Sequence, residues 1–264
     1  MKLRIAFILA LVAALFAPAA AGAQDAARIH LIHGIPDTAV DVAAGGDVVI
    51  PGFNFGDTQD LSGFAGTTLP GVQVLLEGTD TVAIDIGDLP IPASGNITAI
   101  AHLDAEGTPT VSIFSNDVSE IAAGQGRITV RHTAAAPAVD ILADGAVAFS
   151  NVPNGEEGGL DLPAGTISAE VVPTGETEPV VIGPAPLPIG EGSSLIVYAV
   201  GSLEGGSLTV LTETIDGLGA VPALVNAGNS PVSSSNPLPF LLIAGFVIAS
   251  LGVAGTRRTA TVRS

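Results

Sequence analysis

The first residues that could do chemistry are two aspartates and two phenylalanines within residues 51–66. Asp57 and Asp60 offer carboxylate oxygens of the kind that calcium prefers. Phe53 and Phe55 are two positions apart, so an extended backbone would put both rings on one face, where they could stack on a sugar. These four residues are the candidate ligand residues. The alternative, which we favour for the phenylalanines, is that they cap a hydrophobic core.

The other acidic residues do not strengthen a metal site. Asp57 and Asp60 do not fit the ligand pattern of an EF-hand loop. Asp80, Asp85 and Asp88 are too dispersed to form a set of ligands. We therefore expect no metal and no cofactor, and we interpret the acidic residues as a surface that keeps the protein soluble.

Two histidines occupy similar places in the sequence, and each is followed eight positions later by an aspartate: His33 by Asp41, and His132 by Asp140. Strand alternation puts both histidines on the same face as the apolar residues before them. One interpretation makes each a ligand or a base. We favour a structural role, in which an inward imidazole hydrogen-bonds the loop after its strand. The same alternation predicts that both aspartates point outward.

Sequence patterns for an enzyme are absent. There is no G-x-S-x-G, no H-E-x-x-H and no glycine-rich phosphate loop after a strand. The neighbouring carboxylates Glu156 and Glu157 lie in a glycine-rich segment, and we expect a solvated turn there. The chain has no cysteine, which excludes disulfides, thiolate metal sites and a cysteine nucleophile. We predict that the protein is not an enzyme.

The elements that must position these residues are short strands. Apolar residues alternate with period two, and Gly, Pro, Asn and Asp interrupt them every ~8–12 residues. The pattern predicts an all-β fold of about seven strands per copy, as in an immunoglobulin-like β-sandwich. A closed barrel would give the same pattern.

The sequence also contains an internal repeat. The block R-I-H-L-I-H-G-I-P-D-T-A-V-D-V begins at Arg28, and R-I-T-V-R-H-T-A-A-A-P-A-V-D-I begins 99 residues later at Arg127. Shorter matches, Asn54 with Asn151 and Leu-Pro at 69–70 with Leu-Pro at 162–163, suggest an offset that drifts between 93 and 99. We predict two tandem sandwich domains, residues 28–118 and residues 127–216.

These two blocks resemble the opening motif of the bacterial domain-of-unknown-function family 4397, whose usual form is V-H-A-S-P-D-A-P-A-V-D-V. The L-P-A-G-T at residues 162–166 also matches that family. The resemblance implies exported, envelope-anchored proteins, often with tandem copies, and it implies no activity. The first copy has Gly34-Ile35 where the family shows Ala-Ser, so we expect the resemblance to be closer in the second copy.

Both ends of the chain carry targeting patterns. Residues 1–23 have a basic start, an apolar run and small residues up to Ala23, which predicts a secretory signal cleaved there; an uncleaved anchor is the alternative. Residues 217–237 are predicted to be a flexible stalk. The uncharged segment from Leu238 to Gly255 is long enough for one membrane helix, and the basic tail 256–264 would then be cytoplasmic. A sorting tail that is later removed is the other interpretation.

The charge of −18, from 26 acidic and eight basic residues, argues against nucleic acid as a partner. The sequence therefore favours a non-enzymatic, single-pass protein of the cell membrane. Its ectodomain would lie outside the cell, with a structural or adhesive role in the envelope. The alternative is an extracellular module that binds a cation or a glycan with loops of the first copy.

Overall fold

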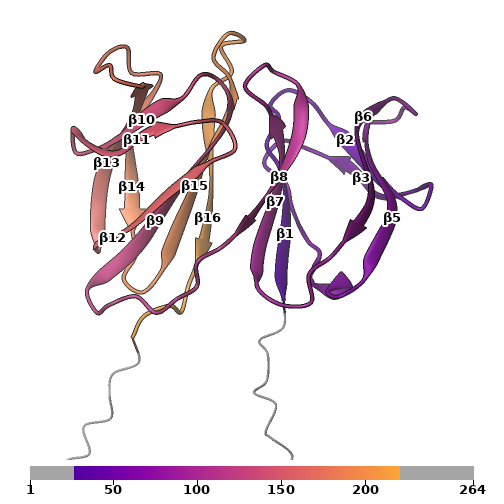
Figure 1. The fold of residues 1–264 in the computed structure, drawn as a ribbon, viewed down its shortest axis with the longest axis horizontal. Helices are drawn as coiled ribbons and strands as arrows, with labels where there is room; N and C mark the ends of the chain where they lie inside the picture. The colour runs from indigo at the N-terminus through magenta and orange to yellow at the C-terminus, as the bar shows by residue number, and fades with distance from the viewer. Residues whose placement is uncertain (1–26, 221–264) are drawn as a thin grey trace, which may run out of the picture. The chain divides into compact units, whose positions relative to one another are not determined.

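The computed structural model describes residues 27–220 (Figure 1). The predicted signal at 1–23, the membrane segment 238–255, the tail 256–264 and all but the first residues of the predicted stalk at 217–237 lie outside these described residues. Between residues 27 and 220, no helix is long and apolar enough to cross a membrane.

Eight strands, β1–β8, form the first half of the described chain, and they pair as two four-stranded sheets. One sheet has the order β4-β1-β7-β8 and the other the order β3-β2-β5-β6. The strands are β1 (Arg28–His33), β2 (Val40–Ala44), β3 (Asp47–Phe53), β4 (Thr58–Asp60), β5 (Thr68–Leu76), β6 (Val82–Pro90), β7 (Asn96–Leu103) and β8 (Pro109–Ser115).

The second half, β9–β16, repeats this topology strand by strand, with the sheets β12-β9-β15-β16 and β11-β10-β13-β14. In each half the first strand runs parallel to the seventh, β1 with β7 and β9 with β15. The strands are β9 (Gln125–Ala135), β10 (Val139–Ala143), β11 (Ala146–Val152), β12 (Glu157–Pro163), β13 (Gly165–Pro173), β14 (Ile182–Ile189), β15 (Ser194–Ser202) and β16 (Thr209–Ile215).

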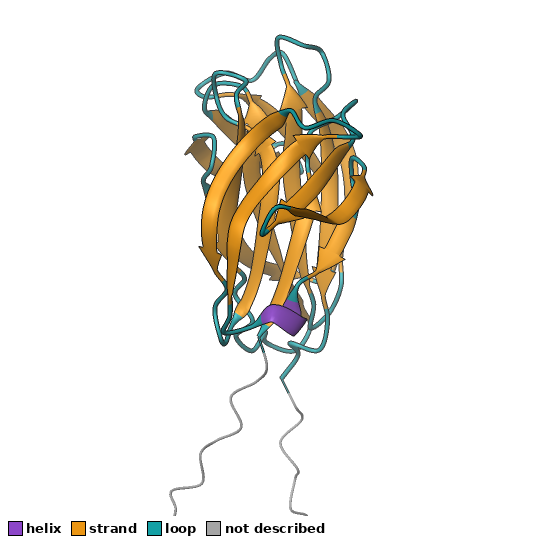
Figure 2. Cartoon of the chain, turned by 90° about the vertical axis from the view of Figure 1, so that its right-hand side faces the viewer, coloured by secondary structure: helices purple, strands orange, loops and turns teal. Residues whose placement is uncertain are grey.

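The prediction of an all-β fold is confirmed, with four sheets of the kind that β-sandwiches contain (Figure 2). Within residues 27–220 the only helical element is one 3-10 turn, η1 (Ser62–Phe64). Each half has eight strands rather than about seven. The difference includes β12, which begins at Glu157, where the sequence suggested a turn. Glycine does not prevent pairing at a sheet edge, and Gly158 and Gly159 pair with β9.

The inner faces of the sheets hold the cores, as period-two burial requires. In the second half one cluster is made by Ile128, Val130, Val139, Ile141, Val152, Val171, Leu187, Ile189, Leu195 and Val197. The first half has two smaller clusters, one around Val40, Val42, Phe53, Val72 and Val74, and one around Ala27, Ile29 and Ile91.

The hydrogen-bonded pairing of the strands shows which residues of the two halves are equivalent, and it does so more exactly than the short sequence matches. Phe53 pairs with Val40 and Val152 pairs with Val139, so the residue before each, Gly52 or Asn151, occupies the same place. Both residues have a positive φ, 61° and 53°. The sequence match of Asn54 with Asn151 is therefore wrong, because a single shared residue type carries less information than the hydrogen-bonded register.

Candidate functional site

The outer face of sheet β4-β1-β7-β8 is buried against the outer face of sheet β12-β9-β15-β16. Both halves lie in one compact unit of the chain. Side chains from both contribute to a single apolar cluster: Ile32, Ile100 and Phe114 from the first half, and Ile196, Tyr198 and Val200 from the second. Within residues 27–220, the faces opposite to the two cores therefore cover one another over much of their area, and they hold fully buried polar residues such as Thr98 and Arg131.

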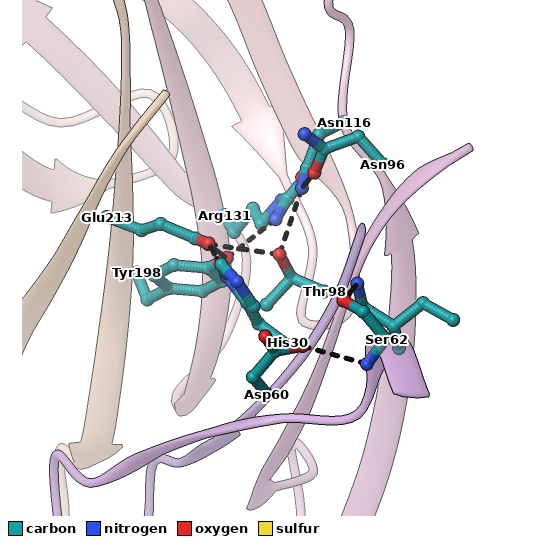
Figure 3. Close-up of polar contacts among 10 residues, drawn as sticks. His30, Asp60, Ser62, Asn96, Thr98, Asn116, Arg131, Tyr198 and Glu213 are labelled. Carbon is teal, nitrogen blue, oxygen red and sulfur yellow. Dashed lines mark hydrogen bonds and ion pairs between the residues drawn. The ribbon is translucent and has the colours of Figure 1, made fainter. Parts of the chain in front are cut away.

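Arg131 is the centre of this interface and is only 1% exposed. Its guanidinium, on β9, donates from Nε to Glu157 and from one terminal nitrogen to the Tyr198 hydroxyl, both at 2.7 Å. The other terminal nitrogen donates across to Asn116 of the first half, also at 2.7 Å (Figure 3). The guanidinium carbon lies 4.3 Å from the ring centre of Phe114. Arg131 thus joins the halves by a hydrogen bond and by a cation–π contact.

Glu213, on β16, makes the reverse crossing from the second half to the first (Figure 3). One carboxylate oxygen lies 2.6 Å from Nδ1 of His30. The other accepts hydrogen bonds from the hydroxyls of Thr98 and Tyr198, each at 3.0 Å. Thr98 is 0% exposed, so this carboxylate satisfies a hydroxyl that has no access to water.

Tyr198 connects the two crossings, since its hydroxyl accepts from Arg131 and donates to Glu213. Burial raises the pKa of this phenol well above its ordinary value, and the Glu213 charge acts in the same direction. Asn116 closes the network by donating to Asn96 at 2.8 Å and to Thr98 at 3.0 Å. Among the described residues, no buried side-chain nitrogen or oxygen lacks a hydrogen-bond partner.

A cavity of about 430 Å³ adjoins this cluster, where the chain leaves β8 and passes over β9, β12 and β15. Its walls include Arg131 and Arg127, two of the three arginines among residues 27–220. Arg127 makes two hydrogen bonds to the Asp161 carboxylate, at 2.7 and 3.1 Å, and lies 3.0 Å from Asp117. Hydrogen bonding to Asp161 raises the pKa of Arg127. The residues that line the cavity are Asn116, Asp117, Arg127, Thr129, Arg131, Glu157, Gly159, Leu160, Asp161, Ser194 and Ile196.

The structure does not bring the four candidate ligand residues together as an exposed set. Phe53 is 5% exposed and lies in the first-half core, where it stacks on His33 with 5.7 Å between ring centres. Phe55 packs against the cluster between the halves. Asp57 accepts a hydrogen bond from the backbone N–H of Asn54, and Asp60 accepts one from that of Ser62. The Phe53 ring is thus too buried to stack on a sugar, whereas Phe55 is half-buried.

The motif histidines have equivalent partners. His33 Nε2 lies 2.8 Å from the Thr38 carbonyl, and His132 Nε2 lies 3.0 Å from the Pro137 carbonyl. Both imidazoles are at most 1% exposed, and burial lowers the pKa of each below its usual value. These are contacts with the loops that follow the strands.

The motif aspartates alternate with core residues along β2 and β10, and their carboxylates are covered by backbone N–H groups that donate to them. Asp41 accepts from Gly52 at 2.7 Å and from Gly78 at 2.9 Å. Asp140 accepts from Asn151 and Gly175 at the same two distances. These hydrogen bonds lower the pKa of both carboxyls. The pairing with the next strand shifts register around each aspartate, yet the residues on both sides of each aspartate still belong to the cores.

Sequence reasoning also missed the two buried arginines, Arg127 and Arg131. Glu157 is exposed, as expected, and it is the carboxylate partner of Arg131. The available signal was the scarcity of arginine in a very acidic chain, with Arg127 and Arg131 placed four residues apart on one strand. In the described part of the chain, no group of three or more His, Cys, Asp and Glu side chains could hold a metal ion.

The halves share one topology and one placement of the motif residues, which is the setting for the comparison with known families. Residues 27–142 match the family described as domain of unknown function DUF4397. The DUF4397 match covers the whole first half and reaches β10, so it includes the copy in which we expected the weaker resemblance. No curated protein matches the chain.

Proposed function

We propose that this chain is a non-enzymatic surface protein in which two tandem, immunoglobulin-like modules of the DUF4397 type act as one rigid unit. The role is structural or adhesive, in the cell envelope. The observation that carries the proposal is the burial of Arg131 and Tyr198 between the halves. Modules joined only by a linker move independently unless their interface is extensive and apolar.

Separation of the halves would expose the apolar cluster around Ile100, and it would remove the acceptor of the Thr98 hydroxyl and the donor to the Asn116 side-chain oxygen. Exposure of apolar area and loss of buried hydrogen bonds both cost free energy. The linker adds to this, because Arg127 binds the carbonyls of Asp117 and Ser119 within it. A fixed spacing between modules suits a protein that transmits force or holds a surface away from the cell.

Export and anchoring are supported by the sequence patterns of residues 1–23 and 238–255. Expression in a bacterial host tests them, with one epitope tag inserted in 226–237 and another after Ser264. We expect a membrane-impermeant antibody to label only the first tag on intact cells. A chain truncated after residue 237 should appear in the medium. Recovery of the full chain in the cytosol would contradict the proposal.

Rigidity is tested separately, and the absence of native cysteine makes the experiment simple. Asp80→Cys and Glu176→Cys place spin labels on exposed sites, one in each half. We expect pulsed electron resonance on the full chain in micelles to give one narrow distance distribution. A distribution as broad as that of two modules on a free linker would refute the rigid unit.

A further inference from the structure

We propose that the cavity over β9 and β12 is a binding site for a small neutral polyol, about the size of one sugar ring. This inference goes beyond the structural role and does not depend on anchoring. The cavity volume of about 430 Å³ lies within the range of small-molecule sites. Most of its wall is polar, and two charged side chains in that wall, Arg127 and Arg131, are at least nine-tenths buried.

Gly159 shows that the space is kept open. The neighbouring Gly158 is required by packing, because a Cβ there would lie 2.5 Å from the Phe149 ring. A Cβ on Gly159 would meet only Thr129 Oγ1 at 3.3 Å and the Ile128 carbonyl at 3.7 Å, and Gly159 has no positive φ. Glycine inside a strand is less stable there than alanine. Here it leaves out a side chain that would enter the cavity.

The cavity wall contains both hydrogen-bond donors and acceptors, which the hydroxyl groups of a polyol can bind. The Arg131 guanidinium has five N–H groups, of which its hydrogen bonds to Glu157, Tyr198 and Asn116 use three. Glu157 and Asp161 have oxygens that can accept from ligand hydroxyls, and their side chains are 38% and 32% exposed. Leu160 and Ile196 offer apolar contact for the C–H face of a ring.

The charges in the wall favour a neutral ligand. Three carboxylates, Asp117, Glu157 and Asp161, surround two arginines, and each arginine already has a carboxylate partner. An anion would have to compete with these ion pairs. A metal ion is disfavoured because no set of three ligating side chains exists among the described residues. A polyol can use both kinds of group without displacing either.

The first half differs at the equivalent place. In the second half Thr129 of β9 pairs with Gly159 of β12. In the first half the equivalent pair is His30 of β1 and Asp60 of β4, and the Asp60 carboxylate accepts a hydrogen bond from the backbone N–H of Ser62. The position equivalent to Arg127 is Arg28, which is exposed. The features that open the cavity therefore belong to the second half.

The test is saturation-transfer NMR on the full chain in lauryldimethylamine-oxide micelles, which contain no sugar. The probes are glucose, mannose, galactose, N-acetylglucosamine and myo-inositol, each alone. We expect transfer to at least one ring, and we expect Gly159→Val to reduce it by about tenfold or more because the valine fills the cavity. Gly63→Val is the matched control, because a Cβ on Gly63 would meet nothing within 4 Å.

Asp117→Ala provides a second variant in case Gly159→Val unfolds, because Asp117 lies at the rim with its side chain 60% exposed. It should weaken the transfer without unfolding the protein. No transfer to any of the five probes would overturn the proposal. So would transfer that persists unchanged in folded Gly159→Val, or in Asp117→Ala if the valine variant is unfolded.

Discussion

The two halves have the same strands in the same register, yet the side chains on their outer faces differ in kind. At three equivalent positions the first half is apolar and the second half is polar or charged: Ile32 and Arg131, Ile100 and Tyr198, Phe114 and Glu213. At a fourth the order is reversed, with Thr98 in the first half and Ile196 in the second. The inner faces do not differ in this way, since both are aliphatic. The shared topology is therefore accompanied by similar cores. The outer faces have different side chains, and this difference makes one half complementary to the other.

The polar residues of one outer face contact the apolar residues of the other directly. The Phe114 ring of the apolar set receives the Arg131 guanidinium of the polar set, 4.3 Å from its centre. If both outer faces carried the polar set, two guanidiniums and two carboxylates would have to be desolvated in one interface. If both outer faces carried the apolar set, each half would expose an apolar surface prone to aggregation before the halves pack together.

The largest effect in the comparison should come from Arg131→Ala. It leaves the Tyr198 hydroxyl and the Asn116 carbonyl without their donor inside the interface. We expect the free energy of unfolding to fall by about 3–5 kcal/mol, as for other broken buried charge networks. Urea unfolding of the full chain in micelles measures this, with the fluorescence of Tyr198, the only tyrosine, as the interface probe.

Arg28→Ala is the matched control in the first half, because Arg28 is exposed. It should change stability by no more than about 0.5 kcal/mol. Equal losses for the two arginine variants would show that the second-half arginine has no special role in joining the halves.

A smaller loss is expected for Tyr198→Phe, which removes only the hydroxyl between Arg131 and Glu213. Leaving these buried partners unsatisfied should cost about 1–3 kcal/mol. Ile100→Val at the equivalent position removes one methylene and should cost about 0.5–1.5 kcal/mol. Urea unfolding followed by circular dichroism compares them, and a neutral Tyr198→Phe would mean that the hydroxyl is dispensable to the interface.

The smallest difference should be the pH dependence contributed by His33 and His132, one in each half. Burial lowers the pKa of both histidines in the folded state below 6.5, the ordinary value. Between the lowered pKa and 6.5, the unfolded chain therefore binds more protons than the folded chain. Their stabilisation is present above pH 6.5 and is lost as the pH falls below it. Thermal unfolding at pH 7.5 and 5.5 should show this loss.

His33→Gln and His132→Gln should each reduce that pH dependence to a similar extent, because both imidazoles have the same kind of carbonyl partner. A reduction confined to one variant would show that the histidines differ in environment although their motifs agree.

Much of the inner architecture was predictable. Period-two alternation marked residues such as Ile128 and Val130 as core, and the repeated blocks placed His33 and His132 at equivalent positions of β1 and β9. The backbone partners of Asp41 and Asp140 were not predictable, because they lie 11 to 37 residues further along the chain. Phe53 and Phe55, two residues apart, pack in two different clusters, since β3 ends between them.

Local alternation and the repeated blocks are enough to predict the fold class, the apolar faces of the strands and the correspondence of the two motif blocks. What covers the other faces depends on how the two halves pack. Arg131 and Tyr198 alternate with residues of the second-half core, as solvent-facing residues would. Alternation states which residues share a face, but whether that face meets water or another sheet depends on contacts far apart in the chain, such as the one between His30 and Glu213.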